Sequence, residues 1–461
     1  MSFVFKSFTL SRIAIFFIAI ITGFYILKYD KWTDENGVIT SDVILYYAYL
    51  PAAFIYNDIS LEFTKDEKTK GEFRIWSLKD PTKKHVLKMS MGVAYLYAPF
   101  FVVGHWYAKL SGNSALGYSK PYHIALMISS LCYLIIGFVF LKKLLKMFFN
   151  EFVTAFTILL IFIGTNLFYY ATLQSPMSHV YSFSLITVFV FYTIKWHQKT
   201  TLTRTIILGV LLGIISLIRP TNVIVGLFLL LYNIKSVKDI KERFFFFIKK
   251  FPHLILIAIC AVLIWLPQFY YWKTVTGHWM FYSYRDENFF FNSPEIIYGL
   301  FSYKKGWLLY TPLMFFAIVG IIISYKHLKQ LFFPTVIFFV FNIYIIFSWW
   351  CWWYGGSLGQ RVMIDSYGIM AIFLALFIHW IWQKKFWIKI PFLLLILLTA
   401  FMSVIYTIQY KSGALHYDAM GKKAYWDNFG HLEPHGNYWS DIECPDYDKA
   451  MKGMYEIKKC D

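Results

Sequence analysis

The sequence predicts an all-α polytopic membrane protein, on the basis of its composition, its apolar runs and the placement of its basic residues. Of 461 residues, 58% are hydrophobic and 15% are charged, whereas soluble domains average nearer a quarter charged residues. Apolar runs such as 13–27 and 386–409 have the length of helices that cross a hydrocarbon core of about 30 Å. Several similar runs follow one another along the chain.

The formal net charge of +18 does not indicate a nucleic-acid partner. The basic residues fall in short clusters between apolar runs, which is how membrane topology is encoded. The first run lacks a small-residue cleavage site and further spans follow it, so we expect a retained helix instead of a signal peptide.

Basic clusters also assign the two faces of the membrane. Those at the start of the chain place the N-terminus inside, so the first helix exits near Tyr29. The stretch Met91–Leu110 is apolar, but a span there would put the lysines after residue 141 outside. We therefore predict an interfacial or re-entrant helix at Met91–Leu110, within one large outer loop at 29–120.

The remaining runs alternate across the membrane. Two short apolar halves, 205–218 and 223–231, predict a hairpin of half-depth helices whose Arg-Pro tip lies inside the bundle. The pattern gives roughly eleven membrane segments in a domain at 1–409. A polar tail at 410–461 follows and is predicted to lie outside. Cys444 and Cys460 share this tail, so they can form a disulfide if it lies outside the cytoplasm.

Asp42 follows the first span and begins an apolar, helix-like segment on the predicted outer side. A carboxylate held there is suited to act as a general base toward an acceptor hydroxyl or amine. The alternative is a helix N-cap, because Ser41 or Asp42 precedes an apolar run. The residue types alone favour neither.

Arg219 interrupts an apolar stretch, and an arginine in such a place usually marks a site or has a partner. Its guanidinium can bind a phosphate through two parallel hydrogen bonds. The structural alternative is that Arg219 binds backbone carbonyls freed by Pro220.

Residues 349–361 combine four tryptophans, a tyrosine and a glycine-rich turn that ends in Arg361. An interfacial aromatic belt explains the tryptophans. Alternatively, the glycines let the backbone approach a ligand closely, and Arg361 can contact an anionic group on it. Along a helix, Arg361 is expected to pair with Asp365. We interpret His179 and the charged run 285–287 as structural or solvated by default. No metal-ligand spacing, phosphate loop or nucleophile motif is present.

The order of these motifs resembles the GT-C superfamily of membrane glycosyltransferases, in particular the bacterial branch related to protein O-mannosyltransferases and to the aminoarabinose transferase of lipid A. The resemblance covers most of residues 1–370. It rests on Asp42 and on the segments 88–92, 117–122, 164–170, 178–179, 213–222 and 349–361.

The resemblance implies a GT-C-like bundle in the bacterial inner membrane, with its active site facing the periplasm or exterior. The donor would be a sugar on polyprenyl phosphate, and the acceptor a lipid, glycan or protein. Asp42 matches the family's catalytic acid, which deprotonates the acceptor, and an inverting displacement is expected. Ser41 precedes it where many relatives carry a second acid, so no metal or other cofactor is expected.

Further roles follow from the same resemblance and from the chemistry of the residues. Donor-phosphate binding is expected of Arg219, Arg361 and Lys88, although Met89 and Ser90 replace the prolines that often follow this lysine. Sugar or acceptor contacts are expected of Trp353, Tyr354 and His179.

Other functions share some of these features. A lipid or glycan flippase would also contain a buried arginine and broken helices. An inverted repeat would favour this interpretation, and none is visible in the sequence. A polymerase or ligase that uses polyprenyl-pyrophosphate-linked glycans is an alternative within the enzyme class. A non-catalytic membrane scaffold would leave the pattern of Asp42, Arg219 and Arg361 unexplained.

Overall fold

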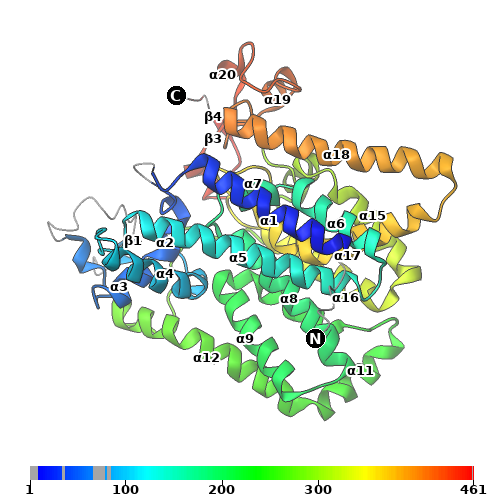
Figure 1. The fold of residues 1–461 in the computed structure, drawn as a ribbon, viewed down its shortest axis with the longest axis horizontal. Coiled ribbons are helices and arrows are strands. Elements are labelled where there is room, and N and C mark those ends of the chain that lie inside the picture. Colours follow the sequence, from blue (N-terminus) through cyan, green and yellow to red (C-terminus); the bar gives the residue numbers. More distant parts are fainter. Residues whose placement is uncertain (1–8, 34–36, 66–77, 80–84, 459, 461) are drawn as a thin grey trace, which may run out of the picture.

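The computed structural model describes residues 9–33, 37–65, 78–79, 85–458 and 460. Helices make up most of it (Figure 1), and the predicted all-α polytopic class is confirmed. Parts of the predicted outer loop, at 34–36, 66–77 and 80–84, lie outside the described residues.

The longer helices are α1 (Leu10–Tyr29), α4 (Gly92–Leu110), α5 (Lys120–Leu145), α6 (Glu151–Ile163), α8 (Ser178–Gln198), α9 (Leu202–Ile218), α11 (Lys238–Lys249), α12 (Phe251–Thr276), α15 (Met314–His327), α16 (Lys329–Phe347), α17 (Tyr367–Trp382) and α18 (Phe386–Ser412). Short α-helices are α2 (Ser41–Tyr47), α3 (Tyr49–Phe54), α7 (Leu167–Thr172), α10 (Gly226–Leu231), α13 (Ile296–Phe301), α14 (Trp307–Tyr310), α19 (Lys422–Asp427), α20 (Tyr438–Asp441) and α21 (Tyr447–Ala450). The 3-10 helices are η1 (Glu62–Lys65), η2 (Pro220–Val225) and η3 (Arg361–Ser366). Two antiparallel pairs of two-residue strands complete the described elements: β1 (Leu78–Lys79) with β2 (His85–Val86), and β3 (Cys444–Pro445) with β4 (Ile457–Lys458).

Among the described residues, six helical segments are long and apolar enough to cross a membrane. They are α1, α5, α12, α16, η3 with α17, and α18. Shorter apolar helices, including α6, α9 and α15, lie between them. Helix α4 is not among the six, and its predicted interfacial position stays a prediction.

The bundle is built around α17. The η3–α17 segment is 94% buried, whereas α12 and α18 are each 17% buried and expose apolar side chains at the edge of the bundle. Small residues permit the closest helix contacts, as is common in membrane bundles. A Cβ on Gly320 would lie 1.9 Å from the carbonyl oxygen of Phe373, so α15 approaches the α17 backbone directly.

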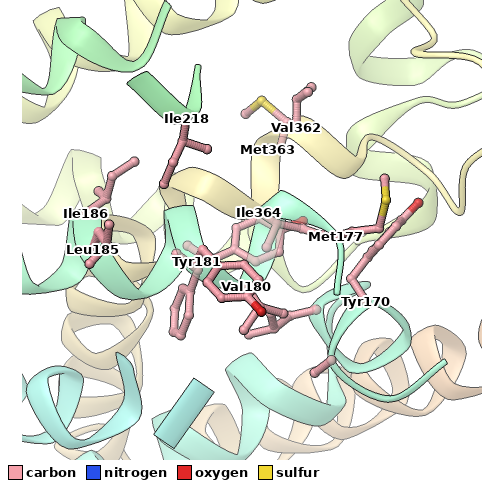
Figure 2. Close-up of a cluster of buried hydrophobic side chains, with 14 of the residues drawn as sticks. Tyr170, Met177, Val180, Tyr181, Leu185, Ile186, Ile218, Val362, Met363 and Ile364 are labelled. Atoms are coloured by element: carbon pink, nitrogen blue, oxygen red, sulfur yellow. The ribbon is translucent and has the colours of Figure 1, made fainter. Parts of the chain in front are cut away.

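Buried side chains also hold the ends of several helices together (Figure 2). Tyr170 and Val180 flank the turn into α8, and Ile218 ends α9 beside Met363 and Ile364 of η3. This contact brings segments from three distant parts of the sequence to one end of the bundle. His179, Arg219 and Arg361 lie on or directly after the same segments.

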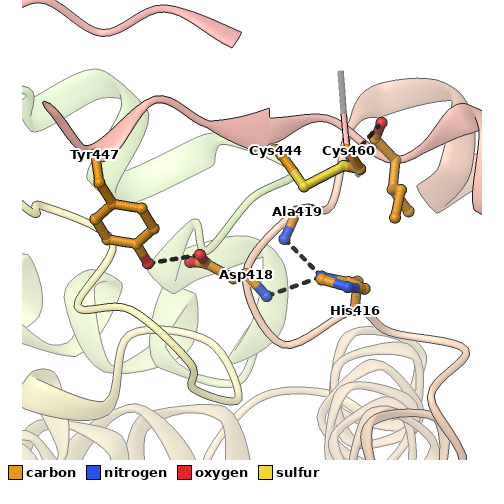
Figure 3. Close-up of a disulfide and its surroundings, with 7 residues drawn as sticks. His416, Asp418, Ala419, Cys444, Tyr447 and Cys460 are labelled. Carbon is orange, nitrogen blue, oxygen red and sulfur yellow. Dashed lines mark hydrogen bonds between the residues drawn. A yellow bond between two sulfur atoms is a disulfide. The ribbon is translucent and has the colours of Figure 1, made fainter. Parts of the chain in front are cut away.

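The tail after α18 folds back as a small unit, and Cys444 and Cys460 form a disulfide within it (Figure 3). Nearby, the Tyr447 hydroxyl donates to Asp418, and His416 Nδ1 accepts from the backbone amides of Asp418 and Ala419. The tail is therefore an ordered part of the fold.

Candidate active site

Asp42 and Arg361 form an ion pair at one end of the bundle. Asp42 lies in the first turn of α2, and its Oδ2 is 3.2 Å from Nη2 of Arg361, the first residue of η3. The N-cap of α2 is Thr40, with no side-chain capping bond seen among the described residues. Asp42 therefore serves as the partner of an arginine and not as the cap.

A second group of polar side chains surrounds Asp365. Its Oδ2 accepts a hydrogen bond from Asn222 at 2.8 Å and lies 3.9 Å from Nη1 of Arg219. The other oxygen, Oδ1, is 3.4 Å from Nδ1 of His179. The expected pairing of Asp365 with Arg361 is wrong, because Arg361–Ser366 forms a 3-10 helix that directs the two side chains to different partners.

Arg219 contacts side chains, which argues against the alternative in which it binds backbone carbonyls. Its Nη2 is 3.3 Å from Ser178 Oγ and 3.4 Å from Nε2 of His179. The predicted helix break is present: α9 ends at Ile218, and Arg219 is extended, as residues before proline favour. The depth of each half of the predicted hairpin stays a prediction.

Tyr46 connects the two groups. Its hydroxyl donates to Ser178 Oγ at 3.4 Å, and Ser178 also contacts Arg219. Burial raises the pKa of Tyr46, and the charge of Asp42 raises it further, while Arg219 opposes the shift. The phenol therefore stays protonated and can donate a hydrogen bond between the carboxylate and guanidinium groups.

Three side chains hold the glycine-rich turn that precedes Arg361. Asn166 Nδ2 donates to the Leu358 carbonyl at 3.0 Å, and the Leu358 amide donates to the Tyr170 hydroxyl at 3.1 Å. The buried Lys305 ammonium donates to the Ser357 carbonyl. The sequence motif 164–170 was visible in advance, but its contact with this turn was not.

Lys88 lies in a neighbouring charged group. Its Nζ pairs with Glu287, whose other oxygen accepts from the Trp350 indole at 3.0 Å. The ammonium also lies 5.1 Å from the ring centroid of Tyr284. Burial raises the pKa of Tyr284, and the charges of Asp42 and Glu287 both contribute to that shift. The solvated interpretation is thus wrong for Glu287, and the Lys88 group lies on the same side as Asp42.

The aromatic segment faces protein, not lipid. Trp350, Trp352 and Trp353 are 8%, 5% and 2% exposed, so the belt interpretation is wrong for these three. Trp353 packs against Tyr447 of the tail, and the Tyr354 hydroxyl donates to the carbonyl of Ile346 at 2.9 Å. Sugar contacts by Trp353, Tyr354 and His179 stay predictions.

Two observations bear on which ligand could bind. Across the described part of the chain, no group of three His, Cys, Asp or Glu residues is arranged to hold a metal ion. The Nε atom of Arg361 is buried and has no hydrogen-bond partner among the described residues. A buried guanidinium donor left without a protein partner is suited to an anionic oxygen.

This chain resembles a known protein in structure, but not in sequence. No protein-family profile matches the chain, and no curated protein matches its sequence. Among solved structures, the chain is similar to the oligosaccharyltransferase of Archaeoglobus fulgidus in its apo form, with 14% sequence identity and a TM-score of 0.48. The alignment covers 100% of this chain and 61% of that chain.

Proposed function

We propose that this protein is a membrane glycosyltransferase that moves a sugar from a polyprenyl-phosphate-linked donor to an acceptor at the outer face of the membrane. The observation that carries the proposal is the Asp42–Arg361 pair, with Arg219 held nearby by Asp365. A general base and two phosphate-binding cations thus lie at one end of an apolar bundle. These are the groups that transfer from a lipid phosphate requires.

In the proposed reaction, Asp42 accepts the proton of an acceptor hydroxyl or amine as that oxygen or nitrogen attacks the anomeric carbon. The bond between the sugar and the phosphate oxygen breaks, and polyprenyl phosphate leaves with the bonding electrons. Attack from the opposite side inverts the anomeric configuration. Because one carboxylate is sufficient for this displacement, no covalent sugar–enzyme intermediate is proposed.

Arg361 is proposed to bind the leaving phosphate through its unpartnered Nε and through the nitrogen that now contacts Asp42. Arg219 is the second proposed phosphate ligand. It is positioned for this by His179 and Asp365, which contact it from α8 and η3. Cations aimed at an oxygen that gains charge in the transition state are among the strongest catalytic contributions.

The proposal is tested by mass spectrometry of the cell envelope with and without the protein, followed by assays of purified protein with the identified polyprenyl-phosphate sugar. Loss of one sugar from an envelope glycan, restored by the wild-type chain but not by D42N, supports it. Accumulation of the unused lipid-linked donor on the cytoplasmic side, with D42N fully functional, would indicate the flippase instead.

The membrane face on which the proposed reaction takes place is tested separately. Lys422 is an exposed residue of the tail, and K422C supplies a thiol there. Labelling by a membrane-impermeant maleimide in intact cells places the tail outside, whereas Lys238→Cys should label only after lysis. The reverse pattern would contradict an outer-face active site.

A further inference from the structure

Helix α11 (Lys238–Lys249) lies at the end of the bundle away from α2 and α3 (Figure 1). One of its faces docks on the end of α8: Arg243 Nη1 is 2.9 Å from Nδ1 of His197, and Phe246 packs on Trp196 with ring centroids 5.7 Å apart. This contact fixes the rotation of α11 about its own axis. The other faces of the helix therefore have defined directions.

One of these other faces is an apolar stripe. Its members recur at helical spacing and are between 53% and 83% exposed: Val237, Ile240, Phe244, Ile248 and Phe251. Within the described part of the chain, no residue of α11 is buried. Such a stripe on a helix docked by its other side is typical of helices that lie in a membrane interface.

The stripe continues directly into a lipid-facing surface. Phe251 is also the first residue of α12, a candidate span that is only 17% buried. The exposed apolar side chains of α12 begin one turn later, at Ile255 and Ile259. Because α12 must present these side chains to acyl chains, the adjoining stripe of α11 meets the same leaflet.

Charge identifies the kind of lipid. Lys238, Lys241 and Lys249 are exposed on α11, and Lys235 is exposed just before it. On a helical projection Lys241 borders the apolar stripe, and Lys238 and Lys249 lie farther round the helix on the same side, where lipid head groups would be. Basic residues next to a membrane-embedded apolar face attract anionic lipids.

We propose that α11 is an interfacial helix that binds anionic phospholipids of the cytoplasmic leaflet, with its apolar stripe among the acyl chains and its lysines on the head groups. This inference is independent of the proposed glycosyl transfer. It concerns the opposite end of the bundle, and neither of its tests measures activity.

The depth of the stripe is tested with the full chain in nanodiscs containing phosphatidylglycerol. Nitroxide labels at F244C and E242C are compared after Cys132, Cys260 and Cys351 are replaced by alanine. The label at 244 is expected to collide preferentially with oxygen, and the label at 242 with a water-soluble nickel complex. Equal nickel accessibility at both positions, or spin–spin broadening at 244 from a second copy of the chain, would overturn the proposal.

The lipid preference is tested by quantifying the lipids that remain with the purified protein. In the triple variant K238Q/K241Q/K249Q, the ratio of retained phosphatidylglycerol to phosphatidylcholine is expected to fall several-fold. A matched variant, K422Q/K452Q/K458Q, removes the same charge from exposed positions of the tail and should leave the ratio unchanged. An equal fall in both variants, or no fall in the first, would contradict specific binding at α11.

Discussion

The carboxylate of Asp42 lies 3.2 Å from the guanidinium of Arg361, although α2 and η3 are far apart in the sequence. Each group is the partner of the other in this structure, and each has a separate role in the proposed reaction. A donor phosphate that takes over Arg361 would release Asp42 toward the acceptor. Donor binding and exposure of the base would then be coupled through one contact.

The first prediction concerns Asp42. D42N retains the size of the side chain but cannot accept the acceptor proton, so the transfer rate should fall by about 10²–10⁴-fold, as for loss of other general bases. The rate is measured under saturating donor at matched expression. D286N is the control, because Asp286 is an exposed acid and its loss should leave the rate unchanged. Full activity in D42N would remove Asp42 from the mechanism.

The second prediction concerns the coupling between Asp42 and Arg361. R361Q should raise the KM for the donor and lower kcat, because a phosphate ligand is lost in both the ground state and the transition state. Residues in contact do not act additively, so the double variant D42N/R361Q should lose less activity than the product of the single losses. Strict additivity would indicate that the ion pair has no part in the reaction.

Much of the fold class was predictable because it depends on local properties. Span length, apolar composition and basic clusters are read along the chain, and each predicted run near α1, α5 or α18 corresponds to a helix. The break at Arg219 was predictable for the same reason, since Pro220 restricts the preceding residue. These features need no knowledge of distant contacts.

The partners within the site were not predictable, because they are set by packing between distant segments. Helical spacing predicted that Arg361 pairs with Asp365. In the 3-10 helix η3, however, Arg361 pairs with Asp42 and Asp365 accepts a hydrogen bond from Asn222. Glu287 looked solvated in a charged run until its contact with Lys88 was seen. Sequence reasoning found the reactive residue types and missed which of them meet.

The third prediction concerns Asn166 and Tyr170, which hold the turn before Arg361 through Leu358. N166A removes a hydrogen bond to a buried carbonyl and loosens the turn, so kcat should fall by roughly tenfold or more, since small displacements of a catalytic group are costly. Asn166 and Tyr170 are positioning residues. In the double variant D42N/N166A, kcat should therefore be only slightly lower than in D42N alone. N113A, which changes an exposed asparagine between α4 and α5, is the matched control.

The fourth prediction concerns the disulfide of the tail. The bond between Cys444 and Cys460 closes a short loop, with a sequence separation of 16, and loops of this length are stabilised by about 3 kcal/mol. C444S should therefore make the tail much more sensitive to limited proteolysis while the membrane domain stays intact. Reduction of the wild-type protein should produce the same pattern, whereas C132S should not. Unchanged proteolysis in C444S would show that packing alone holds the tail.

The fifth prediction concerns pH and the buried ammonium of Lys305, which lies in the loop before α14. Burial lowers the pKa of Lys305 from 10.5 to about 7, although Asp418 acts in the opposite direction. Between these values the unfolded chain binds a proton that the folded chain does not, so stability should rise with pH over this range and level off below about 7.

The comparison that isolates this effect is between the wild-type protein and K305M, which keeps the length of the side chain without its charge. The stability of the wild type relative to K305M should increase from pH 7 to pH 9 by a few kcal/mol, since each pKa unit corresponds to about 1.4 kcal/mol. Thermal unfolding of the purified protein in one detergent, across buffers of constant ionic strength, measures the difference. A difference that does not change with pH would mean that Lys305 keeps its proton in the folded protein, held by Ser357 and Asp418.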